Sequence, residues 1–157
     1  MHLYFLRHGE ADWPNWKKSD DERPLTERGR KEMAKVAAFL RALEIELDQI
    51  ISSPLPRASQ TAKIVADKLK LKVREDSVLK PGFDISGLRH LIEKYPEQTL
   101  MVVGHEPDFT DVISDLTGAR LKLSKAGLAL VNLDTKGMDG RLLWLFPPKI
   151  AKTAVRS

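Results

Sequence analysis

Short apolar runs alternate with longer amphipathic stretches along most of the chain. Four runs have the length and composition of buried strands: residues 3–6, 49–52, 71–74 and 100–103. Four stretches with apolar side chains at helical spacing predict helices: residues 26–43, 56–69, 88–92 and the segment opened by residue 107. Thr26 suits the N-cap of the first helix, and Pro56 suits the first turn of the second.

The last third of the chain has a different pattern. Two apolar stretches, residues 128–133 and 142–146, flank a glycine-containing turn at 137–140, which predicts an antiparallel pair of strands. We therefore predict an α/β fold with a mostly parallel central sheet, helices on both faces and antiparallel strands late in the chain. Residues 1–148 are expected to form one domain, and residues 149–157 a flexible basic tail.

Composition narrows the functional classes. The chain of 157 residues contains no cysteine, which excludes disulfides, cysteine-based zinc sites and cysteine nucleophiles. Its 26 basic residues are nearly balanced by 22 acidic ones and form no dense block, so only the isoelectric point of about 9.3 favours nucleic-acid binding. No apolar run approaches the ~18–20 residues of a membrane span, and a signal peptide is not recognisable. We expect a cytoplasmic protein.

Polar clusters follow three of the predicted strands. Arg7 and His8 follow the first strand, residues 52–57 follow the second and include Arg57, and His105 follows the strand of residues 100–103. Ligands of open α/β sheets bind beyond the carboxyl ends of the strands, so these side chains are expected to converge. Two arginines and two histidines repel one another unless an anion lies among them, and guanidinium groups match phosphoryl oxygens. The pattern predicts a phosphoryl site in which one neutral histidine attacks phosphorus and the other, if protonated, stabilises its oxygens.

The same residues resemble the motifs of a known family. Residues 7–10, Arg-His-Gly-Glu, resemble the RHG signature of the histidine phosphatase (phosphoglycerate-mutase-like) superfamily. Residues 52–62 resemble its second motif, and residues 103–105 its third. Residues 23–29, RPLTERG, match the stretch that follows the first motif. Within the superfamily the short chain, without a large insertion between the second and third motifs, is most similar to SixA-type phosphohistidine phosphatases.

The resemblance implies a role for each pocket residue. His8 is implied to be the phosphorylated nucleophile, Arg7 and Arg57 to bind the phosphate, and His105 to complete the pocket. It also implies that the reaction needs no metal or other cofactor. Glu10, next to the first motif, either orients the pocket or balances its positive charge.

The acid that protonates the leaving group is not settled by the motifs. Many members of the superfamily place a carboxylic acid before the third motif or directly after its histidine, and here those positions hold Asp84 and Glu106. Each also fits a structural role at the start of a helix. An alkoxide needs a proton to leave, whereas imidazole leaves far more easily. A weakly supplied acid therefore favours a phosphoramidate substrate such as phosphohistidine.

We predict a phosphatase that acts through a phosphohistidine on His8, with phosphohistidine on a protein as its preferred substrate. Two alternatives stay open: hydrolysis of a small sugar or nucleotide phosphate, and binding of a phosphorylated partner without turnover. Neither nucleic acid nor a membrane is an expected partner, and a monomer is expected. The acidic loop of residues 12–23 carries Trp13 and Trp16, which either pack it onto the body or contact a protein substrate.

Overall fold

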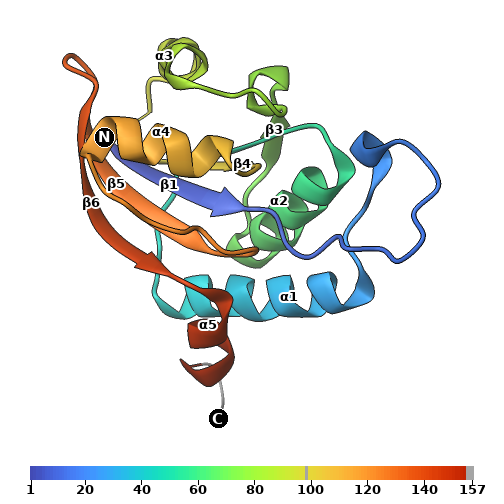
Figure 1. Ribbon diagram of the computed structural model, residues 1–157. Coiled ribbons are helices and arrows are strands. Elements are labelled where there is room, and N and C mark those ends of the chain that lie inside the picture. Colours follow the sequence, from blue (N-terminus) through green and yellow to red (C-terminus); the bar gives the residue numbers. More distant parts are fainter. Residues whose placement is uncertain (98, 155–157) are drawn as a thin grey trace.

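A six-stranded sheet lies at the centre of the computed structural model, which describes residues 1–97 and 99–154 (Figure 1). In chain order its strands are β1 (His2–Arg7), β2 (Gln49–Ser52), β3 (Val73–Glu75), β4 (Thr99–Gly104), β5 (Leu128–Asp134) and β6 (Asp139–Phe146). Their order across the sheet is β3-β2-β4-β1-β5-β6. The pairings from β3 to β1 are parallel, and those of β5 with β1 and β6 are antiparallel. The predicted mostly parallel sheet with late antiparallel strands is confirmed.

The register of the parallel strands determines where their ends lie. Arg7, the last residue of β1, pairs with Gly104, the last residue of β4. Ser52, the last residue of β2, pairs with Val103 of the same central strand. Three strands from distant parts of the sequence therefore end at one edge of the sheet, where the polar clusters begin.

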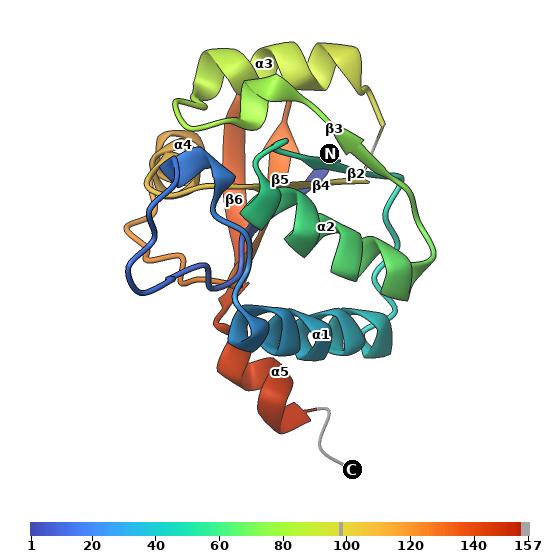
Figure 2. The ribbon, with the colours of Figure 1, turned by 90° about the vertical axis from the view of Figure 1, so that its right-hand side faces the viewer.

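Helices cover both faces of the sheet, as predicted (Figure 2). One face carries α1 (Glu27–Ala42), α2 (Pro56–Leu69) and α5 (Pro148–Ala154), and the other carries α3 (Ile85–Lys94) and α4 (Asp108–Thr117). Successive side chains of a strand point to opposite faces, so Tyr4 and Leu6 join the first core whereas Leu3 and Phe5 join the second. Within the described residues, no helix combines the length and apolarity needed to cross a membrane.

Local hydrogen bonds explain where the helices begin. The Thr26 hydroxyl accepts the N–H of Gly29 at 3.0 Å and caps α1, and Pro56 occupies the first turn of α2. Both features were predicted. The Asp84 carboxylate accepts the N–H of Gly87 at 2.9 Å, so α3 begins ahead of the predicted range of residues 88–92.

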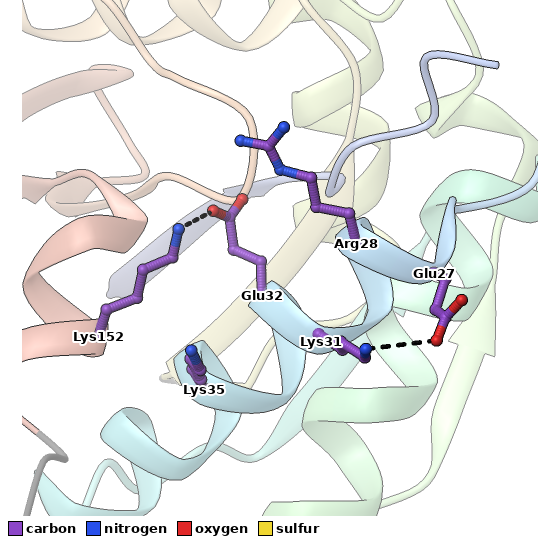
Figure 3. A pocket seen from close by; sticks show the side chains of 6 residues that line it. All are labelled: Glu27, Arg28, Lys31, Glu32, Lys35 and Lys152. Carbon is purple, nitrogen blue, oxygen red and sulfur yellow. Dashed lines mark ion pairs between the residues drawn. The ribbon is translucent and has the colours of Figure 1, made fainter. Parts of the chain in front are cut away.

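The expected flexible tail is wrong for residues 149–154, which belong to α5. Ala151 is fully buried in the core beside α1, and Lys152 Nζ lies 2.8 Å from Glu32 Oε2 of α1 (Figure 3). A helix this short shows no clear apolar period, and its lysines suggested a solvated end. Residues 155–157 of the expected tail lie outside the described residues.

Phe109 of α4 is expected to be essential to the core of its layer. Its ring is fully buried and packs edge-on against Phe5 at 5.2 Å and Phe83 at 5.9 Å between centroids. We expect Phe109→Ala to lower the free energy of unfolding in urea by about 3–5 kcal/mol, because truncation leaves a cavity. As a control, Leu43→Ala at a half-exposed position is expected to lose less than about 1 kcal/mol. Equal losses for the two variants would contradict this packing.

Candidate active site

The aligned strand ends bring the four predicted pocket residues together. Arg7 and His8 come from the end of β1, His105 from the end of β4, and Arg57 from the first turn of α2. The backbone N–H of His8 donates to the Gly104 carbonyl at 3.1 Å, and the His8 and His105 ring centroids lie 5.4 Å apart. The positive charges of Arg7 and Arg57 act on the His8 ring.

His8 is a buried, neutral imidazole whose tautomer is set by the backbone. Its Nδ1 lies 2.7 Å from the Gly9 carbonyl oxygen, which can only accept, so Nδ1 carries the proton and Nε2 the lone pair. Burial is the main cause that lowers the pKa of His8 to about 3, and the nearby positive charges act in the same direction. At neutral pH the ring therefore offers a nucleophilic Nε2.

His105 is also neutral and presents a buried donor. Its Nε2 lies 2.8 Å from Ser53 Oγ, and that oxygen already accepts the N–H of Leu55 at 3.2 Å. The Ser53 hydroxyl can donate its own proton to His105 Nε2, and in that arrangement the ring proton is on Nδ1. Burial, followed by the charge of Arg57, lowers the pKa of His105 to about 4. In the free pocket His105 is thus an N–H donor rather than the cation considered from the sequence.

Arg7 and Arg57 each have one buried N–H group without a partner in the described part of the chain. Arg7 donates from Nη1 to the Leu123 carbonyl at 3.0 Å, and Arg57 donates from Nη1 to the Asp20 carbonyl at 2.9 Å. Arg7 Nε, Arg57 Nε and His105 Nδ1 are buried and have no hydrogen-bond partner within the described part of the chain. We call these three atoms the donor cluster. Unpaired buried polar atoms are costly, and the side chains that carry them all act on His8, which suits an oxyanion bound among them.

Comparison with known families agrees with this geometry. The family model of the histidine phosphatase superfamily (branch 1) matches residues 3–81, about half of the chain, which include Arg7, His8 and Arg57. The chain belongs to the histidine phosphatase superfamily. An uncharacterized protein of Picosynechococcus sp. is 35% identical over 137 residues, which are 82% of each chain.

Relatives of this histidine phosphatase include SixA proteins. Phosphohistidine phosphatase SixA of Escherichia coli is 27% identical over 161 residues, covering 98% of both chains. The structure of protein histidine phosphatase SixA complexed with tungstate has a TM-score of 0.83 at 26% identity, over 96% of this chain and 99% of that one. A mycobacterial glucosyl-3-phosphoglycerate phosphatase shares the fold, with a TM-score of 0.71 at 18% identity over 90% and 96% of the two chains. The resemblance to SixA-type histidine phosphatases is confirmed.

Two hydroxyl groups support the histidine phosphatase pocket, and sequence reasoning missed both roles. Thr61 Oγ1 accepts the N–H of Gly9 at 3.0 Å and donates to the Arg57 carbonyl at 2.7 Å, which links the first motif to the second. Its place four residues after Arg57, on the same helix face, was the available signal. Ser53 Oγ accepts the N–H of Leu55 and contacts His105 Nε2, so it joins the second motif to the third.

The predicted acidic site residues have structural partners. Glu106 Oε1 accepts the N–H of Thr110 at 2.7 Å, and its Oε2 accepts the Thr110 hydroxyl. Asp84 caps α3, and Glu10 Oε2 lies 3.4 Å from Arg28 Nε. None of these three carboxylates is among the charges that shift the pKa of His8 or His105. In residues 1–97 and 99–154, no group of three or more His, Asp or Glu side chains is arranged to hold a metal ion.

Carboxylates from the loop of residues 12–23 do reach the pocket. Asp20 belongs to a short 3-10 turn, η1 (Asp20–Glu22), and its Oδ2 lies 3.6 Å from Arg57 Nη2. The charges of Asp20 and Asp21 act on both Arg57 and His105. Sequence reasoning did not single out Asp20, although the acidic run directly before the RPLTERG stretch was visible.

The tryptophans of this loop donate hydrogen bonds to backbone carbonyls in and next to the loop. Trp13 Nε1 donates to the Pro24 carbonyl at 2.7 Å, and Trp16 Nε1 donates to the Ser19 carbonyl at 2.9 Å. The two rings lie 6.2 Å apart between centroids. These bonds hold the loop in a definite shape beside the pocket, and Trp13 still exposes 39% of its surface.

The two neutral histidines predict a loss of stability in acid. An unfolded histidine titrates near pH ~6.5, whereas the folded pKa is about 3 for His8 and about 4 for His105. Below pH ~6.5 the unfolded chain binds protons that the folded pocket excludes, so stability is present above that pH and declines as the pH falls towards the folded values. In phosphate-free buffer, the free energy of unfolding is expected to fall by up to about 2 kcal/mol per histidine between pH ~7 and ~5.

Urea unfolding at several pH values measures this loss. The double variant His8→Asn/His105→Asn, which carries neither imidazole, is expected to lose most of that part of the pH dependence. If the free energy of unfolding of the double variant changes with pH as steeply as that of the unmodified protein, the two rings are not held neutral.

Proposed function

We propose that this histidine phosphatase removes phosphoryl groups through a covalent phosphohistidine on His8. The donor cluster beside a neutral His8 ring is the main support for the proposal. A phosphoryl group bound there would pair Arg7 Nε, Arg57 Nε and His105 Nδ1 with its oxygens, and the two guanidinium charges would offset its own. The His8 Nε2 lone pair is then the nucleophile.

The reaction follows in two displacements. In the first, His8 Nε2 forms a bond to phosphorus while the bond to the leaving group breaks and its electron pair departs with that group. The His8 Nδ1–H stays bonded to the Gly9 carbonyl, which stabilises the positive charge that develops on the ring. In the second, water attacks phosphorus, releases orthophosphate and returns a neutral His8.

The proposed reaction needs no metal ion. Phosphoryl transfer depends on positive charge around the equatorial oxygens of the transferring group. Arg7 and Arg57 bring two such charges to the pocket, and His105 adds a neutral donor. These three side chains would perform the electrostatic work that a divalent cation performs in other phosphoryl-transfer enzymes.

The preferred substrate in this proposal is phosphohistidine on a protein. Support comes from the similarity to phosphohistidine phosphatase SixA over 98% of both chains. A second support is that the carboxylates of both candidate acids are engaged as hydrogen-bond acceptors at helix starts, Asp84 with Gly87 and Glu106 with Thr110. Imidazole leaves without strong acid assistance, whereas the alkoxide of a sugar phosphate does not.

The two alternatives fit these residues less well. A small sugar or nucleotide phosphate would release an alkoxide, which needs a proton, and both candidate acids are engaged in local hydrogen bonds. A module that only binds phosphorylated partners does not need a neutral histidine with a defined tautomer and an unprotonated Nε2.

His8→Ala is expected to lower kcat by at least about a thousandfold with every substrate, because both displacements pass through Nε2. The measurement is steady-state turnover of a phosphohistidine peptide and an aryl phosphate. His90→Ala, which removes an exposed histidine of α3, is the matched control and is expected to keep full activity. Turnover by His8→Ala close to that of the control would eliminate the covalent route.

A substrate panel tests the proposed preference. We expect kcat/KM to be highest for a phosphohistidine peptide, lower for an aryl phosphate and lowest for sugar and nucleotide phosphates, following the ease with which each group leaves. EDTA is expected to leave all of these rates unchanged. Comparable values across the panel, or a preference for a sugar phosphate, would reject phosphohistidine as the substrate. Tight phosphate binding without product release from any compound would support the binding module instead.

A further inference from the structure

Asp20 lies where the phosphate pocket meets a second hollow. Its carbonyl oxygen accepts Arg57 Nη1 at 2.9 Å, and its carboxylate lies beside Arg57 Nη2 at 3.6 Å. The same residue lines a shallow hollow of about 740 Å³ on the loop of residues 12–23, together with Trp13, Trp16 and Arg23. One aspartate therefore contacts a side chain of the phosphate pocket and lines the hollow beside it.

His8 and Asp20 differ strongly in exposure to solvent. His8 is only 9% exposed, whereas the Asp20 side chain is 71% exposed. In a phosphoryl transfer the leaving atom lies opposite the attacking atom. A group that leaves opposite the buried His8 departs towards solvent, and Asp20 is an exposed acid that contacts the pocket residue Arg57 and lines the neighbouring hollow.

The Asp20 carboxylate is held in place and can still accept a hydrogen bond. Its Oδ1 accepts Arg23 Nε at 2.9 Å, and the Ser19–Glu22 capping box fixes the turn that carries it. Its Oδ2 is too far from Arg57 for a hydrogen bond, so both lone pairs of that oxygen are available. Arg57 Nη1 is taken by the Asp20 carbonyl, which leaves Nε of Arg57 for a phosphoryl oxygen without displacing the aspartate.

We propose that Asp20 is a catalytic residue that accepts a hydrogen bond from the leaving imidazole and makes the pocket selective for P–N over P–O substrates. This inference rests on the proposed phosphohistidine substrate. A phosphorylated imidazole has phosphorus on one ring nitrogen, and a proton on the other nitrogen makes the ring a cation. The Asp20 carboxylate stabilises that cation through a charge-assisted hydrogen bond.

The leaving group carries a different charge in the two kinds of substrate. The P–N bond breaks as the bond to His8 Nε2 forms, its electron pair returns to the imidazole, and the second nitrogen keeps its proton. The leaving ring is neutral, and no proton moves to Asp20. With a sugar phosphate the leaving group is a developing alkoxide, which an ionised carboxylate repels and cannot protonate. The same side chain therefore assists one reaction and opposes the other.

The decisive test compares Asp20→Asn with Asp21→Asn on two substrates. Both variants remove one negative charge from η1, but the Asp21 side chain makes no ion pair in the described structure. For Asp20→Asn we expect kcat/KM for a phosphohistidine peptide to fall about tenfold or more, because a hydrogen bond to a charged group is lost. The kcat/KM of Asp20→Asn for an aryl phosphate is expected to stay the same or rise. Asp21→Asn is expected to keep the ratio of the two kcat/KM values, peptide to aryl phosphate, that the unmodified enzyme has.

A rapid-quench experiment locates the effect within the cycle. Asp20→Asn is expected to slow phosphorylation of His8 by the peptide and to leave hydrolysis of the phosphoenzyme unchanged, because the imidazole has already left. Asp20→Glu, which keeps the carboxylate, is expected to recover part of the preference for the peptide. Thermal unfolding of each variant confirms that the exposed substitution leaves the fold intact.

Each outcome decides between distinct explanations. An equal loss of kcat/KM on both substrates would mean that Asp20 only positions Arg57. No loss of kcat/KM on either substrate would mean that Asp20 does not touch the leaving group. Both results overturn the inference. If the unmodified enzyme hydrolyses the aryl phosphate but not the peptide, the proposed substrate itself is wrong and the inference falls with it, whatever the variants do.

Discussion

Parallel pairing of β1 with β4, and of β4 with β2, is the constraint on which the site depends. The register ends the three strands within one residue of each other, so segments near residues 7, 53 and 105 meet at one edge of the sheet. Two backbone bonds secure the junction: the N–H of His8 to the Gly104 carbonyl and the N–H of Ser53 to the Val103 carbonyl. A slip of one residue would turn the strand side chains to the opposite face and separate the pocket groups.

The apolar core has to hold together groups that repel one another. Arg7, Arg57 and two histidines share a small volume, and three of their N–H donors have no partner in the described structure. The two strands that lead into the first and third motifs, β1 and β4, are fully buried along most of their length, which offsets this unfavourable grouping. The same burial keeps His8 neutral, so the features that reduce stability are those that make the ring a nucleophile.

Much of this arrangement follows from local sequence patterns. The strand ends alone placed Arg7, His8, Arg57 and His105 at one site, because strand position and polarity are visible in short windows. Thr61 and Asp20 were not found, since their roles depend on contacts with residues 52 and 37 positions away in the chain. Helix α5 was missed because so short a segment carries no clear period. For Asp84, helix capping was weighed from the sequence, and the structure shows the bond that caps α3.

The central claim is that phosphoryl transfer passes through the His8 ring. Its most direct test is to quench the enzyme during turnover of a phosphohistidine peptide and to locate the phosphoryl group by mass spectrometry under alkaline conditions. The account predicts an acid-labile phosphoryl group on His8, formed no more slowly than product. Turnover without any phosphorylated enzyme, or a phosphoryl group on His105 alone, would contradict it.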